Sequence, residues 1–566
     1  MNNNEFEQKE KGMSGNLRVV DGIEDSIHGR YVMIASGPRK IWRAIEDFAE
    51  NAVFKDLTRQ GITVVTDKAK RDLREKVQGW TSFRKGYVAT QLGWYGRHFV
   101  MPDGRCWPKL KPKGENLVIA FQPNPKAHQR GTLKEYRSAI KPIVKGQSLC
   151  LSMIAYSLAP ILIDVVRETP YAVDTTGLDV VAPPKFGKTT LLGLTGAQHG
   201  GESSRRGYCE SWSDTEEAHA ERFGFYNASF AGYDETGTSK GESLERKFTG
   251  VFNKVMRMHD AKPRARFGDT RPYIPTTVFY ASTGNCSVRR ALQTLGAELP
   301  DTVVTRMFTI DIGASPHGIF DCTPIGFKTD KEAANELSSG IQRQYGSLGR
   351  IFAKRVVNAR AKNKQAFQEK VVALMELFMG KARHEFADIP DRLLHPLALA
   401  YAAGRLLKEW RVFGKGWGSF EKALLGLLRL AMASLAEQPA AIQGSPSCED
   451  VIAKYAREHD LVDARGSKVV MTRSEIRSSA GIIHRQKAGH IELLIHPTQL
   501  AQKLPGHATI LAALKAKKLL ATEGTRRMTV KRMTISNDRL YAIRIRPESM
   551  TGSFGVPVPD HKLGSA

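Results

Sequence analysis

The sequence predicts an α/β protein whose central part is a parallel sheet with crossover helices. Between about residues 170 and 312, short apolar segments such as LDVVAP, ASFAGYDE, TTVFYASTG and MFTIDIG alternate with helical stretches, which is the pattern of a parallel sheet. Residues 330–437 follow a helical period with few breaks. The composition, 41% hydrophobic and 25% charged over 566 residues, can bury large cores, so it excludes wholesale disorder and a fibrous repeat.

The elements around this centre follow from shifts in pattern along the chain. Alternating segments such as GRYVMIAS and GITVVT predict strands near the N-terminus, and Thr132 and Glu135 have the spacing of a helix capping box. We predict a flexible tail at 1–12, a mixed α/β N-terminal domain at 13–128, the core with its leading helices at 129–325, a helical lid at 326–437, a linker at 438–447, a basic domain at 448–548 and a tail at 549–566.

Charge, cysteine usage and hydropathy narrow the class of protein. Lys and Arg number 84 against 58 Asp and Glu, a formal charge of +26, which predicts an anionic partner such as nucleic acid. The six cysteines never form a C-x-x-C pair, which argues against a disulfide scaffold or a zinc ribbon. The longest apolar stretch, 149–163, is shorter than the roughly 20 residues of a membrane span. We expect a buried helix there, and a soluble cytoplasmic protein with no membrane partner.

The strongest motif is LDVVAPPKFGKTTLLGL at 178–194. It follows the phosphate-binding loop pattern G-x-x-x-x-G-K-[ST], with Ala182 where the first glycine is usual. In that pattern backbone N–H groups surround the β-phosphate, Lys188 neutralises the β/γ-phosphates and the Thr189 hydroxyl binds Mg²⁺. The competing interpretation is an ordinary strand–turn–helix unit. The predicted cofactor-binding residues are Ala182, Pro183, Pro184, Lys185, Phe186, Gly187, Lys188, Thr189 and Thr190.

Asp234 and Glu235 end the next strong apolar strand. Phosphoryl hydrolysis needs one carboxylate to hold the metal and its water shell and another to polarise the attacking water. An adjacent Asp-Glu pair after a strand supplies both, so we predict that Asp234 is a metal ligand and Glu235 a catalytic base. Such a pair alone is more often a solvated turn.

Two further segments supply candidate catalytic residues. The strand 276–285 ends in Thr283 and Asn285, which could contact the γ-phosphate, although such residues are also common in turns. Arg306 precedes the last apolar strand and could act in trans on the nucleotide of a neighbouring subunit, or simply be a surface arginine. The segment from Asn253 to Met256 lacks the aspartate of a guanine-reading N-K-x-D motif, which favours ATP over GTP.

These motifs, in this order, resemble a P-loop ATPase domain family of phages and integrative mobile elements that includes self-loading replicative helicases, relatives of minichromosome-maintenance helicases. LGWYGRHFVMPDG, GTLKEYRSAI, SWSDTEEAHAERF, YGSLGRIF, RLLHPLALAYAAGRLLKEW and IELLIHPTQL are similar to its segments, and the resemblance covers roughly residues 85–546. It departs from the family at Ala182 and at Thr283-Gly284-Asn285. The resemblance implies an AAA+-like ATPase core, a C-terminal winged-helix-like domain, ATP and Mg²⁺ as cofactors, DNA as partner, a homo-oligomeric ring with a hexamer as the favoured size, and a nucleotide contact from Arg392.

Basic residues concentrate in two regions. Residues 258–273 could project a basic loop that grips a phosphate backbone without reading sequence, or be a solvated loop. Residues 461–550 carry 17 Lys/Arg against 6 Asp/Glu, a difference of +11. There a helix over 509–524 and an alternating ribbon over 525–547 predict a winged-helix arrangement, with a protein-interaction wing as the alternative. The candidate DNA-binding residues are Lys262, Arg264, Arg266, Arg271, Lys515, Lys517, Lys518, Arg526, Arg527, Lys531 and Arg532.

The sequence therefore predicts an ATP-dependent DNA translocase or helicase of a phage or mobile genetic element, acting in DNA replication. The alternative is an ATP-switched DNA-binding initiator or loader with little translocation. A nucleotide-binding defence or regulatory protein is a third, weaker possibility. No His/Glu cluster at metal-ligand spacing supports a metallohydrolase.

Overall fold

A computed structural model describes residues 17–545 with gaps. The chain forms two compact units, one of residues 1–288 and 301–436 and one of residues 289–300 and 437–566. The residues left undescribed are 1–16, 111–115, 202–206, 214–215, 217–218, 220–221, 223, 235–243, 261–275, 289, 292–305, 414–415, 437–447, 465–470, 486–490, 505–506, 517–518, 522–528, 533–535 and 546–566. The predicted tails and linker lie within these ranges.

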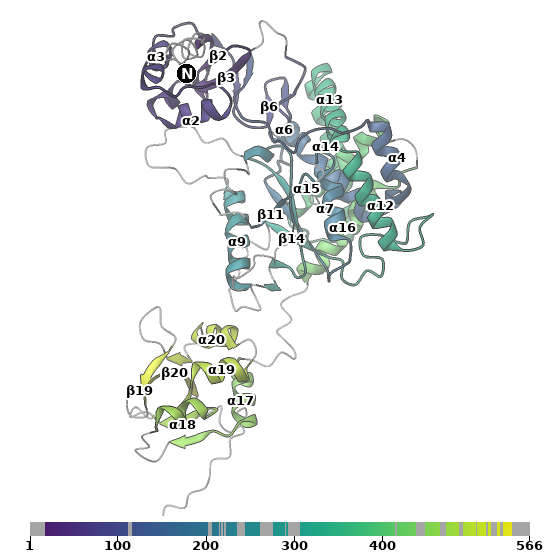
Figure 1. Cartoon of the computed structure of the whole chain (residues 1–566). Helices are drawn as coiled ribbons and strands as arrows, with labels where there is room; N and C mark the ends of the chain where they lie inside the picture. The colour runs from purple at the N-terminus through teal and green to yellow at the C-terminus, as the bar shows by residue number, and fades with distance from the viewer. Residues whose placement is uncertain are drawn as a thin grey trace, which may run out of the picture. The chain divides into compact units, whose positions relative to one another are not determined.

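The first unit begins with a four-stranded sheet of order β3-β2-β1-β4 (Figure 1). Its elements are β1 (Arg18–Asp25), β2 (Gly29–Ser36), β3 (Arg39–Ala44), η1 (Glu46–Ala49), α2 (Ala52–Arg59), α3 (Asp67–Gln78) and β4 (Arg84–Lys85). Val32 and Ile34 of β2 share a core with residues of both helices. The strand predicted at GITVVT is wrong: this segment is an unpaired connection between α2 and α3. Ile62 and Val64 alternate because both are buried in that core.

Two small sheets follow. β5 (Tyr87–Ala89) pairs in parallel with β9 (Leu117–Ile119), and β6 (Gly93–Tyr95), β7 (His98–Val100) and β8 (Cys106–Trp107) form an antiparallel sheet. A buried ion pair ties the second sheet to the helical part, because Arg350 Nη2 donates to Asp103 Oδ2 at 2.6 Å. Arg350 Nη1 also donates to Gln129 Oε1. Partners on both sides offset the cost of burying the guanidinium.

The leading helices form the centre of the core. They are α4 (Leu133–Val144), α5 (Ser148–Leu158), η2 (Ala159–Leu162) and α6 (Ile163–Val166). Thr132 and Glu135 form the predicted capping box. Residues 148–166 are long and apolar enough to cross a membrane, yet 94% of their most apolar window is buried inside the protein. The prediction of a buried helix here is confirmed.

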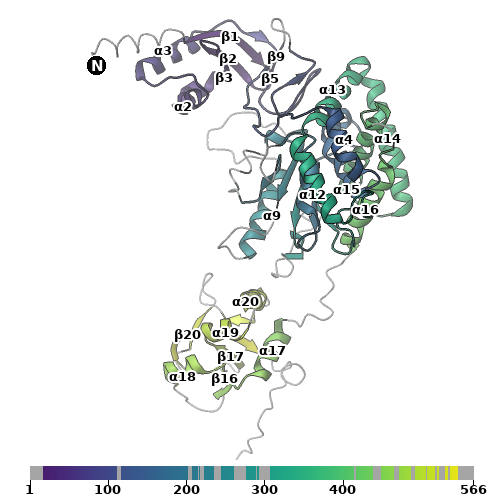
Figure 2. The ribbon, with the colours of Figure 1, turned by 45° about the vertical axis from the view of Figure 1, so that its right-hand side comes forward.

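The central sheet is parallel, as predicted, with strand order β11-β12-β13-β10-β14. The elements are β10 (Thr176–Val181), α7 (Lys188–Gly196), β11 (Glu210–Ser211), η3 (Gly224–Tyr226), β12 (Phe230–Asp234), α9 (Leu244–Asp260), β13 (Phe279–Gly284) and β14 (Met307–Asp311). Figures 1 and 2 show α9 on one side of this sheet and the later helices on the other. The strand order places the end of β13 beside the end of β10, and this neighbourhood positions the candidate site.

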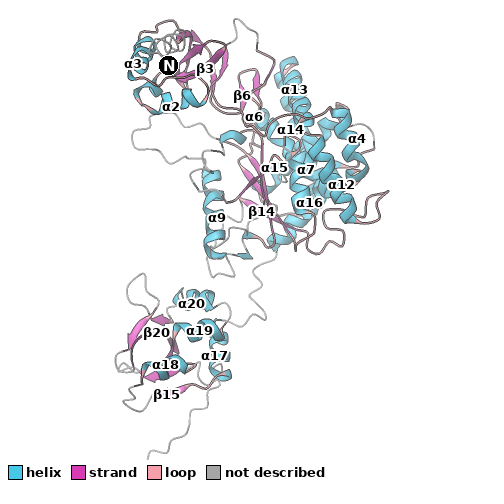
Figure 3. Ribbon diagram, viewed as in Figure 1, coloured by secondary structure: helices cyan, strands magenta, loops and turns pink. Residues whose placement is uncertain are grey.

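The helical stretch predicted over 330–437 contains five helices (Figure 3). They are α12 (Asp330–Arg343), α13 (Ser347–Lys362), α14 (Lys364–Glu385), α15 (Asp391–Glu409) and α16 (Phe420–Ala436). Their apolar faces belong to the same core cluster as α5 and β10. The helices therefore extend one continuous core rather than forming a separate one.

The second unit combines helices with a larger sheet than the predicted wing. Its elements are α17 (Cys448–Glu458), β15 (Val462–Ala464), α18 (Arg473–Ser478), β16 (Ile482–Arg485), β17 (Ile491–Ile495), α19 (Pro497–Lys503), α20 (His507–Ala516), β18 (Leu520–Ala521), β19 (Val530–Arg532) and β20 (Ser536–Ile545). β19 and β20 form the predicted antiparallel ribbon. However, β20 also pairs with β17 and β18, so it is an inner strand. The helix predicted over 509–524 ends at Ala516, because Leu520 and Ala521 pair with β20 instead.

Candidate nucleotide site

The loop between β10 and α7 has backbone geometry suited to an anion. Lys185 and Gly187 both take positive φ angles, 75° and 82°, and alternating left-handed residues turn successive N–H groups toward one side. A non-glycine residue at such an angle costs about 1 kcal/mol or more. A Cβ at Gly187 would lie 3.0 Å from Ile319 Cγ1. This position therefore favours glycine both for its positive φ and for the lack of space. Ala182 is buried and has no positive φ, which explains why a residue with a Cβ stands there.

The Lys188 ammonium lies at the centre of the loop. Its Nζ donates to Ala182 O at 2.6 Å, to Pro183 O at 2.8 Å and to Asn285 Oδ1 at 3.2 Å. The structure thus brings together Lys188, which begins α7 after β10, and Asn285, which follows the neighbouring strand β13. Because loop carbonyls are weaker partners than phosphate oxygens, a bound anion would compete for this ammonium.

Asp234, at the end of β12, forms hydrogen bonds with both α7 and β13. Its carboxylate Oδ1 accepts from Thr189 Oγ1 at 3.2 Å and from Thr283 Oγ1 at 2.6 Å, and the residue is buried at 9% exposure. Tyr233 pairs with Ser282, which brings the carboxyl ends of β12 and β13 to the same edge. Three residues chosen from separate sequence motifs therefore meet at this one edge of the sheet.

The donor chemistry at this edge fits Mg²⁺. Thr189 supplies a hydroxyl oxygen and Asp234 a carboxylate oxygen, and both are hard oxygen donors of the kind that Mg²⁺ prefers. The ion also commonly binds through one or two protein groups together with substrate phosphates. The exposed Thr189 leaves one side of the pair open to such a substrate.

Arg306 and Arg392 lie at the other edge of the sheet. Arg306 immediately precedes β14, and its Nη1 lies 3.3 Å from Met256 Sδ on α9. His259 Nε2 lies 3.2 Å from Tyr280 Oη. Burial, then the charges of Arg306 and Arg392, lower the His259 pKa to about 3. Both arginines therefore lie near one partly buried imidazole. The nucleotide contact of Arg392 stays a prediction.

Several predicted residues lie outside the described part of the chain. Glu235 follows the last described residue of β12, and eight candidate DNA contacts are undescribed: Lys262, Arg264, Arg266, Arg271, Lys517, Lys518, Arg526 and Arg527. Lys515 is exposed at the end of α20. Lys531 and Arg532 are placed in β19 by their backbone.

Sequence reasoning missed Asp179, a fully buried carboxyl in β10. Its Oδ2 accepts from Val288 N at 3.2 Å, and its Oδ1 has no hydrogen-bond partner. Burial raises the Asp179 pKa to about 7, against smaller opposing effects of the Val288 and Ser282 hydrogen bonds. The single charged letter in LDVVAP could have signalled a buried acid. Its bond to Val288 fixes the segment that follows Asn285.

We expect Asp179→Asn to stabilise the protein at neutral pH and to flatten the pH dependence of its stability. The folded pKa lies above the unfolded value of 3.8, so the folded state holds a proton that the unfolded state has lost, and stability falls as pH rises from about 4 to 7. The full effect above pH 7 is on the order of 4 kcal/mol. Urea unfolding of both proteins across this range measures it. Parallel pH profiles would contradict the assignment.

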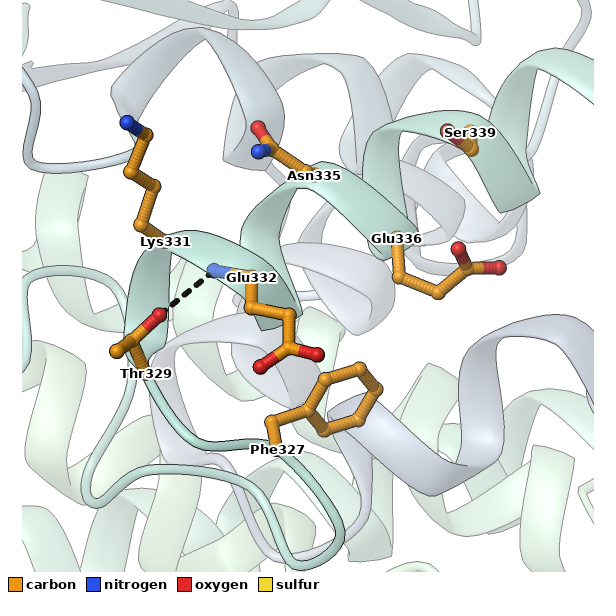
Figure 4. A pocket seen from close by; sticks show the side chains of 7 residues that line it. All are labelled: Phe327, Thr329, Lys331, Glu332, Asn335, Glu336 and Ser339. Carbon is orange, nitrogen blue, oxygen red and sulfur yellow. Dashed lines mark hydrogen bonds between the residues drawn. The ribbon is translucent and has the colours of Figure 1, made fainter.

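A surface hollow of about 400 Å³ lies beside α12 (Figure 4). Its walls come from Phe327 and from the outward side of α12, where Thr329 caps the helix by accepting from Glu332 N. None of the predicted nucleotide residues lines it. Its open, polar character does not suit a nucleotide base.

The fold and this edge define a class: an α/β protein with a glycine-containing loop, a threonine and a carboxylate at the carboxyl ends of a parallel sheet. Residues 7–244, which include the loop and β12, match the family model described as "Domain of unknown function (DUF927)". No curated protein matches the sequence.

Among solved structures, the chain is similar to the active helicase Cch of SCCmec type IV, with a TM-score of 0.52 and 14% identity over 95% of this chain and 94% of that chain. The two proteins share their fold. The apo C-terminal region of NrS-1 matches with a TM-score of 0.23 and 11% identity over 67% of this chain and 83% of that chain.

Proposed function

We propose that this protein is an ATP-dependent DNA translocase, a replicative helicase of a phage or mobile genetic element. The observation that carries the proposal is the meeting of Lys188 with Asn285, and of Thr189 with Asp234 and Thr283, at the carboxyl edge of the parallel sheet. The fold shared with a helicase over nearly the whole chain supports the same conclusion.

Each residue at this edge has a role in ATP hydrolysis. The loop N–H groups and Lys188 bind the β/γ-phosphates, and Thr189 and Asp234 hold Mg²⁺, which neutralises phosphate charge. Glu235 polarises the attacking water. Asn285 holds the ammonium when no phosphate is present, and Thr283 orients the Asp234 carboxylate. In this AAA+-like core, the residues that contact the nucleotide and its metal lie at the carboxyl ends of β12 and β13, beside the loop.

Arg306 acts in trans in this proposal. It lies at the opposite edge of the sheet from the loop of its own chain, so it can reach a nucleotide only on a neighbouring subunit. Arg392 lies close enough to share that nucleotide, because both arginines lower the pKa of the same histidine. A homo-oligomeric ring, a hexamer by resemblance, would place such edges against each other.

DNA is the proposed partner. The formal charge of +26 favours a polyanion. The C-terminal unit, proposed as winged-helix-like, and the basic segment 258–273 supply cations for backbone contact. The Cch neighbour is itself an active helicase. We propose that the protein acts in the cytoplasm during replication of the element.

Unwinding of a forked DNA tests this proposal. The full chain should separate the strands with ATP and Mg²⁺ and should not do so with ADP, and DNA should stimulate steady-state ATP turnover. Near-stoichiometric hydrolysis without strand separation would favour the alternative, an ATP-switched initiator or loader. No ATP binding at all would overturn both.

A further inference from the structure

Two tryptophans lie in a row on one face of the small sheet β6–β8. Trp94 pairs with Phe99, and Phe99 pairs with Trp107, so the three rings share a face across neighbouring strands. Trp94 and Phe99 meet edge to face, with ring centroids 5.2 Å apart. Both tryptophans are half-buried.

Helix α13 lies over this row and sets a cation on each indole. The Arg360 guanidinium lies 4.3 Å from the centroid of Trp94, and the Lys354 ammonium 5.0 Å from that of Trp107. Lys109, next to β8, also lies 6.0 Å from the Trp107 ring. Figure 1 shows α13 beside β6. Contact with an aromatic face restrains a long basic side chain, so less entropy is lost when its charge meets a partner.

All the charged residues of α13 are basic. Its 16 residues include Arg350, Lys354, Arg355, Arg360 and Lys362 and no Asp or Glu. Arg350 is paired with Asp103 and Arg360 with Asp164, which leaves Lys354, Arg355 and Lys362 exposed. Asn358 is also exposed. Lys354, Asn358 and Lys362 are spaced four residues apart, so they lie on the same face of the helix. We call Lys354, Arg355, Asn358 and Lys362 the α13 strip.

We propose that the α13 strip binds the phosphate backbone of DNA. Lys354 and Lys362 are about 12 Å apart along the helix axis, a length that covers roughly three to four phosphate steps along one strand at about 3.4 Å per step. Three exposed cations with no acid among them complement a regular row of negative charges. None of them reads a base, so the contact is independent of sequence. This surface rests on the DNA partner of the proposed function, and it requires no ATP, so it can fail separately from ATP hydrolysis.

The test compares two charge-reversed variants of the full chain. One carries Lys354→Glu, Arg355→Glu and Lys362→Glu. The matched control carries Lys134→Glu, Lys328→Glu and Lys331→Glu. These three exposed lysines lie in α4, just before α12 and in α12, respectively. Binding of a labelled single strand and of its duplex is titrated against salt without nucleotide. The strip variant should lose at least about tenfold in affinity, and its salt slope should fall by about two to three units.

The control should lose much less and keep its slope. Equal losses in both variants would mean that only net charge matters and would overturn the proposal. A glutamine version of the strip variant, checked by thermal unfolding, guards against misfolding; an unchanged slope in that version also overturns it. Poly-glutamate is added as a competitor to distinguish DNA from an acidic protein as the partner. If poly-glutamate displaces DNA as effectively as the same number of DNA charges does, the partner is an acidic protein and the proposal is overturned. The single strand and duplex arms show which DNA form the strip prefers. Because these titrations contain no ATP, their outcome does not depend on whether the protein hydrolyses ATP.

Discussion

Lys188→Ala should abolish ATP binding without unfolding the protein. The ammonium is the central cation of the loop, where it donates to two loop carbonyls and to Asn285, and phosphate oxygens would replace these partners. Alanine leaves the loop with no charge to offset the β/γ-phosphates. We expect ATP affinity measured by calorimetry to fall below detection, and turnover to fall by at least about a hundredfold.

The matched control is Lys185→Ala, which removes an exposed lysine from the same loop. Lys185 has a positive φ, and since alanine also carries a Cβ, the change leaves the strain of this position nearly the same and does not alter the central charge. It should retain most of the ATP affinity. Normal ATP affinity in a well-folded Lys188→Ala protein would discard the loop assignment, and equal losses in both variants would point to loop conformation rather than to charge.

The sequence predicted four of the five described strands of the central sheet because each of those four is an apolar run, whereas β11 (Glu210–Ser211) contains none. β12, β13 and β14 lie within the predicted segments, and β10 begins two residues before LDVVAP, at Thr176. The same reasoning failed at GITVVT, since alternation reports which residues are buried and not whether the segment has a partner to pair with.

The contacts of the candidate site depend on strand order, which no local pattern contains. Asn285 reaches Lys188 only because β13 lies beside β10, and the sequence offered Asn285 and Thr283 without saying which residue each would meet. Thr283 contacts the carboxylate, whereas Asn285 contacts the loop lysine. The proximity of Arg306, Arg392 and His259 likewise joins three separate segments. Asp179 was missed because its neighbours in LDVVAP are apolar.

Glu235→Gln should retain ATP binding and lose turnover by about two orders of magnitude or more. Glutamine keeps the size of the side chain but cannot accept the proton of the attacking water. Asp234→Asn should behave differently, because Asp234 accepts from both Thr189 and Thr283 and is the proposed metal ligand. An amide there weakens Mg²⁺ binding, so its loss should appear as a higher requirement for Mg²⁺. Turnover measured against Mg²⁺ concentration, with ATP binding measured alongside, separates the two variants.

Thr283→Val provides the control for this division of roles. Valine has nearly the shape of threonine but cannot donate to Asp234, so it removes one of the two hydrogen bonds that orient the carboxylate while leaving its charge. We expect a smaller loss of turnover than in either carboxylate variant, with a modest shift in the Mg²⁺ requirement in the same direction as Asp234→Asn. If Asp234→Asn and Glu235→Gln instead show the same modest effect, with unchanged Mg²⁺ dependence, the acidic pair is structural. The contacts of Asp234 with Thr189 and Thr283 would then hold the strand edge together rather than support hydrolysis.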